Sequence, residues 1–190
     1  MASEVNIANR ALQKLGAGSI TYLTQDSVNA RACNSCYTNL RDALLRSHPW
    51  NFAITRTSLA ADATAPTFGR ASAYTLPSDC LRLLPSYPED NSLTEDYQIE
   101  GRKIYSDYSS PLYIRYIYRV TDVNEMDVLF QEALATKMAF EMCEQITQSN
   151  SKKESLREDF KSIIQEAKKL NAFENVASEP PEDEWNTVRI

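Results

Sequence analysis

Apolar residues recur at helical spacing in the first quarter of the chain. One predicted helix covers residues 3–15 and ends at Gly16, because glycine readily adopts the left-handed conformation that closes a helix. A second predicted helix follows Asp26 and Ser27, whose side chains are suited to N-caps, and ends near residue 47. The apolar stripe of this second helix consists of Cys33, Tyr37, Leu40 and Leu44.

The helical period returns after Asp122. Every fourth residue is apolar over five positions, which are Phe130, Leu134, Met138, Met142 and Ile146. Neighbouring alanines widen this face, so the pattern predicts a largely buried helix. The polar residues 148–151 interrupt the pattern, and a final helix is predicted after them. Its apolar stripe consists of Leu156, Phe160, Ile163, Ile164, Ala167 and Leu170.

Between residues 50 and 120 the pattern is that of β-strands, separated by segments rich in turn-forming residues. The predicted strands cover residues 50–59, 73–76, 80–84, 97–100, 103–106 and 112–120. Gly101 predicts a hairpin turn between two of them. The last strand has the clearest alternation, with one face formed by Leu112, Ile114, Tyr116, Tyr118 and Val120.

Two helices before the strands and two after them predict an α+β protein. The apolar stripes of the two helix pairs need each other for burial. We therefore expect one four-helix bundle, formed by residues 1–48 and 121–173. An antiparallel β-region, residues 49–120, is inserted into it, and residues 174–190 form an extended C-terminal tail.

Residues 46–53 mark the change from helix to strand. Pro49 cannot continue a helix because it has no N–H, and it biases His48 toward extended geometry. Trp50 and Phe52 stand two apart, as on one face of a strand. We interpret His48, Pro49, Trp50 and Phe52 as structural anchors, with Trp50 buried and His48 capping the preceding helix near the negative end of its dipole.

Composition and charge restrict the class of protein. The chain is 43% hydrophobic and 24% charged, as in ordinary globular proteins, and its 190 residues suffice for a sizeable core. A net charge of -6 argues against a nucleic-acid-binding surface, which would be basic. Residues 1–5 carry neither a basic nor an apolar signal region, and no apolar run could span a bilayer, so we expect no signal peptide and no membrane contact.

The four cysteines, Cys33, Cys36, Cys80 and Cys143, are expected to be buried and free. Cys33 and Cys36 form a C-x-x-C pair, but a redox pair needs its first cysteine at a helix N-terminus, whereas this pair lies inside a predicted helix. A zinc site would need two further ligands, and the available ones lie in separate elements. We expect no metal and no cofactor.

The sequence also lacks the patterns of an enzyme. His48 is the only histidine, and no G-x-S-x-G motif is present. Four glycines in all exclude a phosphate-binding loop and a dinucleotide fingerprint, which both need several glycines at fixed spacing. We expect no catalytic residues.

The composition changes abruptly after residue 173. Residues 179–184 comprise two prolines and four acidic residues, which cannot build a core of their own. The last six residues have the apolar spacing of an extended ligand: Trp185, Asn186, Thr187, Val188, Arg189 and Ile190. The tail is either solvated throughout or orders on a partner surface with Trp185 as its anchor, and we favour the second interpretation.

Several segments together resemble the head-to-tail adaptor family of tailed bacteriophages, the tail tubular protein A type of short-tailed phages. The most specific segments are H-P-W-N-F-A at residues 48–53 and Y-T-L-P-S-D-C-L-R at residues 74–82. N-R-A-L-Q-K-L-G at residues 9–16 and R-D-A-L-L-R at residues 41–46 add to the resemblance. It covers most of residues 2–170, but neither residues 88–96 nor the tail from residue 174.

The resemblance implies a ring, typically of twelve copies, between the portal protein and the tail nozzle protein of a virion, assembled in the host cytoplasm. Packaged DNA would pass through its channel without sequence-specific binding. It also implies that the C-terminal extension docks on the portal, which suits residues 185–190, and that no catalytic residue carries over. A different class stays open: a soluble adaptor or regulatory protein that binds a partner through its acidic tail.

Overall fold

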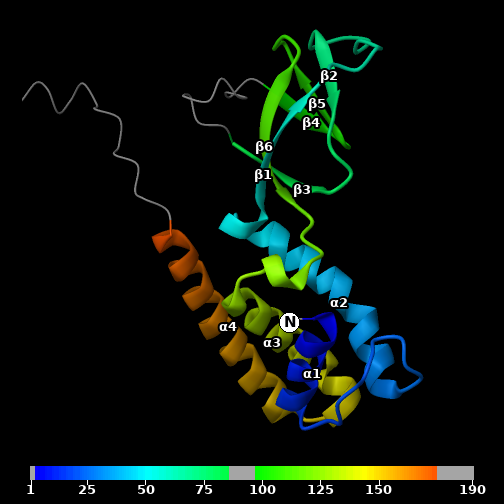
Figure 1. Cartoon of the computed structure of the whole chain (residues 1–190), viewed down its shortest axis with the longest axis vertical. Helices are drawn as coiled ribbons and strands as arrows, with labels where there is room; N and C mark the ends of the chain where they lie inside the picture. Colours follow the sequence, from blue (N-terminus) through cyan, green and yellow to red (C-terminus); the bar gives the residue numbers. More distant parts are fainter. Residues whose placement is uncertain (1–2, 86–96, 175–190) are drawn as a thin grey trace, which may run out of the picture.

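The structure is a computed structural model, and it describes residues 3–85 and 97–174. Within these residues the chain is a mixed α+β protein with four α-helices and two small antiparallel sheets. Figure 1 shows the helices gathered at one end of the long axis and the sheets at the other. The chain passes from the helices to the sheets after the second helix and returns before the third.

Helices α1 (Glu4–Leu15) and α2 (Val28–Ser47) confirm the two helices predicted near the N-terminus. The side chains of Ser3 and Ser27 each accept a hydrogen bond from a backbone N–H of the first turn, as N-caps do. Gly16 closes α1 with a φ of 75°, a left-handed conformation that favours glycine. Local capping therefore sets three of the four ends of these helices.

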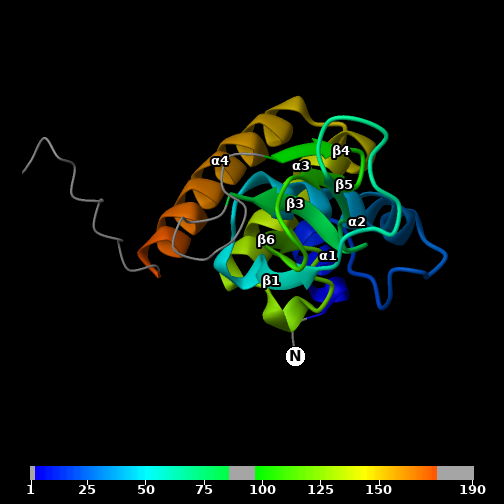
Figure 2. The same cartoon turned by 90° about the horizontal axis from the view of Figure 1, so that it is seen from above.

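Helix α3 (Val128–Thr147) lies at the centre of the helical part. Helices α1, α2 and α4 (Asn150–Phe173) all pack against it, and Figure 2 shows α2 and α4 on opposite sides of it. The broad apolar face predicted for this helix is confirmed, because Ala133, Leu134 and Met138 have no exposed surface. Small alanines among the larger side chains let several helices approach α3 closely.

The strands form two three-stranded sheets in which every neighbouring pair is antiparallel. The first sheet has the order β1 (Ile54–Leu59), β6 (Leu112–Tyr118), β3 (Cys80–Leu84). The second has the order β2 (Ser72–Thr75), β5 (Lys103–Ser106), β4 (Tyr97–Glu100). Gly101, with a φ of 59°, turns the chain between β4 and β5, which confirms the predicted hairpin.

The prediction that a strand begins at residue 50 is wrong. Residues Asn51–Ala53 form a 3-10 turn (η1), and β1 starts after it. The backbone N–H of Ala53 donates to the carbonyl of Trp50 at 2.9 Å, and that of Asn51 donates to the side chain of Asn171 at 2.8 Å. Because these N–H groups are already occupied, they cannot join a strand ladder. Trp50 and Phe52 are spaced two apart because both pack against Phe130 of α3 and not because they lie on one face of a strand.

The buried apolar residues form two clusters. The larger draws on all four helices and includes Trp50 and Val120 from the segments that lead into and out of the sheets. The smaller connects the two sheets and consists of Tyr74, Cys80, Ile104, Leu112, Ile114 and Tyr116. Strand β6 contributes to both clusters, since Ile117 faces opposite to its neighbours and is buried against the helical cluster. Side chains on one face of β6 therefore pack in the smaller cluster, and Ile117 on the other face packs in the larger one.

Candidate functional site at the junction of helices and sheets

Trp50 lies in the packed region where the helices meet the sheets. It is 1% exposed, so the prediction that it is buried is confirmed. Its indole Nε1 donates to the carbonyl of Leu44, near the end of α2, at 3.0 Å. Its ring meets Phe130 of α3 edge-on and stacks on Phe52, with centroid separations of 5.3 Å and 6.1 Å. One side chain therefore ties α2, η1 and α3 together.

His48 is the C-cap residue of α2, at the position that the sequence predicts. Its Nε2 lies 3.3 Å from Nδ2 of Asn171 on α4, and the same amide nitrogen donates to the carbonyl of Pro49 at 3.3 Å. Burial lowers the pKa of His48, and the positive charges of Lys168 and Arg82 lower it further. These effects favour the neutral form of the ring.

Asn51 and Asn171 join η1 to the last turns of α4. The backbone N–H of Asn51 donates to Oδ1 of Asn171, and Nδ2 of Asn51 donates to the backbone carbonyl of Asn171, both at 2.8 Å. Nδ2 of Asn51 also donates to Oε2 of Glu174 at 2.9 Å. The two asparagines stand 120 positions apart, so no local periodicity signals this pair.

Three basic side chains from three elements surround this place: Arg46 of α2, Arg82 of β3 and Lys168 of α4. The guanidinium of Arg46 donates to the carbonyl of Leu81, and Nη1 of Arg82 donates to the carbonyl of Arg46 at 3.4 Å. Lys168 acts on the same histidine as Arg82. These contacts join the end of α2, just before residues 48–53, to residues 74–82.

A groove of about 240 Å³ opens between η1, the 3-10 turn η3 (Val123–Glu125) and the end of α4. It is lined by three apolar and four polar residues, which are Phe52, Met126, Leu170, Glu125, Asp127, Asn171 and Glu174. Two exposed apolar residues adjoin these positions in the sequence, Val128 at 74% and Phe173 at 82% exposure. Exposed apolar area beside a groove is typical of surfaces that a partner covers.

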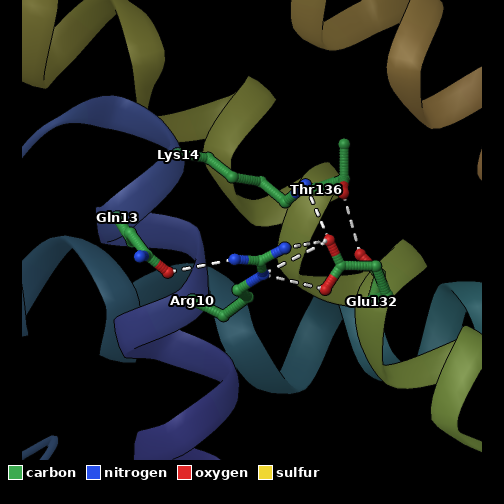
Figure 3. A network of polar contacts seen from close by, with 5 residues as sticks. All are labelled: Arg10, Gln13, Lys14, Glu132 and Thr136. Atoms are coloured by element: carbon green, nitrogen blue, oxygen red, sulfur yellow. Dashed lines mark hydrogen bonds and ion pairs between the residues drawn. The ribbon is translucent and has the colours of Figure 1, made fainter.

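A polar network joins α1 to α3 (Figure 3). Glu132 of α3 accepts hydrogen bonds from Nε and Nη2 of Arg10 at 3.0 and 3.1 Å, and its carboxylate lies 2.7 Å from Nζ of Lys14. Burial opposes the ionisation of Glu132, but Arg10 and Lys14 outweigh it and hold the pKa of this carboxyl below its usual value. No pattern within a single helix predicts this network, because its members belong to different helices.

The environments of the cysteines do not favour thiol reactivity. All four are free, and Cys33, Cys80 and Cys143 are buried as predicted, whereas Cys36 is partly exposed. Burial raises the pKa of the Cys33 and Cys36 thiols to about 11, so neither is a thiolate at neutral pH. Within residues 3–85 and 97–174, no group of three or more His, Cys, Asp or Glu side chains could hold a metal ion.

The predicted partner-binding segment, residues 185–190 from Trp185 to Ile190, lies outside the described residues. Its role stays a prediction. The anchor residues of the junction, in contrast, are brought together, since His48, Trp50 and Phe52 form one aromatic series and Pro49 accepts a hydrogen bond beside it.

Comparison with known protein families and with curated proteins finds no match to this chain. None of the helices in the described part of the chain combines the length and the apolar character that crossing a bilayer requires.

Proposed function

We propose that this protein is a head-to-tail connector subunit of a tailed bacteriophage, one copy in a ring that joins the portal to the tail nozzle. The observation that carries the proposal is the place of the two most specific segments of the resemblance, residues 48–53 and 74–82. Residues 74–82 contact the end of α2 directly before residues 48–53, through Arg46, Leu81 and Arg82. The charge of Arg82 also acts on His48. A connector needs such a junction, because its two parts must hold a fixed orientation while they contact different neighbours.

In this proposal residues 1–48 and 121–173 form a four-helix bundle, and residues 49–120 form a β-region inserted into it. The packing of α1, α2 and α4 on α3 supports the bundle, and the two crossings between helices and sheets support the insertion (Figure 1). In the ring, typically of twelve copies, the bundles stand side by side around a channel. The β-region reaches between neighbours or toward the nozzle, and heterologous contacts close the ring.

The charge of the chain suits a channel that DNA passes through. A net charge of -6 repels phosphate, so a ring of these subunits does not grip the duplex during ejection. The role is structural, places the protein in the virion, and calls for neither a cofactor nor a catalytic residue.

Electron microscopy of the protein mixed with its portal tests the proposal. We expect the isolated protein to be monomeric or weakly associated, and ring-shaped density to appear on the portal. Absence of any association with the portal would overturn the connector and favour a regulator that binds a host protein through its tail. A stable dodecamer without portal would contradict the order of assembly.

The tail supplies a second test, because the proposal assigns residues 185–190 to the portal contact. Deleting them should weaken portal binding at least about tenfold and leave the melting temperature unchanged, since they follow the last helix, which ends at Phe173, by more than ten positions in the sequence. Changing Trp185, Val188 and Ile190 to Ser should reproduce the loss, whereas Asn186→Ser with Thr187→Ser is the matched control that should not. Unchanged portal affinity after the deletion would remove the assignment of Trp185 as the anchor.

A further inference from the structure

Three cations at the junction have no acidic partner within residues 3–85 and 97–174. We call Arg46, Arg82 and Lys168 the junction patch. The guanidinium groups of its two arginines donate to backbone carbonyls, those of Leu81 and Arg46. Carbonyls satisfy the donors but do not neutralise the charge. Other basic residues of this acidic protein are paired, for example Arg10 with Glu132 and Arg119 with Asp42.

Two members of the junction patch, Arg82 and Lys168, act on His48, the only histidine of the chain. His48 contacts Asn171 of α4 at 3.3 Å, and Lys168 lies one helical turn before Asn171 on the same helix. The charges of Lys168 and Arg82 both act on the imidazole and disfavour its protonation. The field at this part of the surface is therefore positive, and an anionic group placed here would be attracted.

The chain itself carries a run of acidic residues a few positions after Glu174. Helix α4 ends at Phe173, and Glu174 already contacts Asn51 beside the junction patch. The run of residues 179–184 holds four carboxylates, on Glu179, Glu182, Asp183 and Glu184. Five residues of extended chain can span up to about 17 Å. Lys168 lies six residues before Glu174, roughly 9 Å along α4, so Glu179 can reach the patch.

We propose that the acidic run at residues 179–184 docks on the junction patch of the same chain. The short tether gives an effective concentration of the order of millimolar, so at lower protein concentrations the run of the same chain prevails over that of another copy. Individual surface ion pairs are weak and screened by salt, but four carboxylates opposite three cations act as one network. Docking would also fix the start of residues 185–190 at the junction. The inference does not rest on the connector role.

His48 is a built-in reporter of this contact, because a single histidine gives a single set of imidazole signals in an NMR titration. We compare the full chain with a tail-neutral variant that carries Glu179→Gln, Glu182→Gln, Asp183→Asn and Glu184→Gln. Docked carboxylates stabilise the imidazolium, so the pKa of His48 should be higher in the natural chain by about half a unit at low salt. The difference should vanish near 1 M NaCl, where the Debye length is about 3 Å. Equal pKa values in the two chains at low salt would overturn the proposal.

A matched control changes the same net charge elsewhere. Asp26→Asn, Glu154→Gln, Glu158→Gln and Asp159→Asn neutralise four acids near the N-terminal ends of α2 and α4, at the other end of the helical part (Figure 1). At about 0.1 M salt this variant should leave the pKa of His48 within about 0.1 unit of the natural value. Asp159 lies twelve residues before Asn171, roughly 18 Å along α4, whereas the Debye length is then about 10 Å. A shift as large as that of the tail-neutral variant would show a general charge effect and overturn docking.

A second comparison uses a chain in which the junction patch is itself neutral. In an Arg46→Gln, Arg82→Gln, Lys168→Gln chain, neutralising the tail should no longer move the pKa of His48, whereas an undiminished shift would overturn the patch as the docking site. Dilution from about 1 mM to about 50 µM should not change the result in the natural chain. Loss of the shift on dilution would assign the contact to a second copy and overturn docking within one chain. Should the triple variant not fold, the tail series and its control decide alone.

Discussion

The helical part and the sheets of this protein are stabilised to different degrees by their own cores. The larger apolar cluster takes side chains from all four helices, whereas the cluster between the sheets consists of six residues. Three strands with an apolar face are the fewest that can be stable by themselves, so each of these sheets is at the lower limit. We infer that the helices carry most of the stability and that the sheets depend on their attachment to them.

The attachment is correspondingly dense. Trp50 belongs to the larger cluster although it directly precedes the turn into β1, and Ile117 of β6 is buried in the same cluster. Asp42 of α2 also binds Arg119, which follows β6, at 2.8 Å. The difference between the two parts shows that a small β-region can be held in place by a few residues at its base.

The largest effect is expected from Trp50→Ala. Removing a fully buried indole that contacts α2, η1 and α3 should cost about 3–5 kcal/mol of the free energy of unfolding. Urea denaturation and thermal melting measure it. Trp185→Ala, which changes the other tryptophan, is the control and should leave the melting temperature unchanged. An unaltered melting temperature for Trp50→Ala would mean that the junction does not support the fold.

Ile104→Ala tests the smaller core. Ile104 has no exposed surface and lies between β2 and β4 in the second sheet, so its truncation should cost about 2–4 kcal/mol. Hydrogen exchange should show lost protection in β2, β4 and β5 with little change in α3. Ile99→Ala, at the cross-strand position and 48% exposed, is the matched control and should cost less than about 1 kcal/mol. Equal loss of protection in α3 would contradict separate stabilities for the two parts.

Glu132→Gln tests the network inside the helical part and should have the smallest effect. The folded-state pKa of Glu132 lies below its ordinary value of 4.5, so the carboxylate contributes stability above that value and loses it as the pH falls through the folded-state pKa. The variant should be about 1 kcal/mol less stable at pH 7. As the pH falls below the ordinary value of 4.5, the difference from the natural chain should shrink, because the unfolded chain binds a proton at this carboxyl before the folded chain does.

Urea denaturation at pH 7 and pH 3 measures this dependence. Glu141→Gln, which breaks an exposed pair with Lys137 on the same helix, is the control and should change stability by less than about 0.5 kcal/mol at either pH. An effect of Glu132→Gln that is the same at both values would show that the carboxylate charge is not what joins α1 to α3.

The sequence alone determined the elements of this protein. Helix stripes, serine N-caps and Gly16 placed the helices, and period-two patterns placed five of the six strands closely, because these signals lie within single elements. It also identified Trp50 as a buried anchor, since a large aromatic residue after a proline stop must find a core.

Only the tertiary structure decided how the elements join. Residues Asn51–Ala53 form a 3-10 turn that contacts Asn171, and Arg10 of α1 pairs with Glu132 of α3. Arg82 and Lys168, from two further elements, lie close enough to His48 for their charges to act on it. Polar contacts of this kind bring together residues from separate elements, so they leave no periodic pattern in the sequence. Their geometry exists only once the apolar faces have packed, which is why the sequence pattern could not predict them.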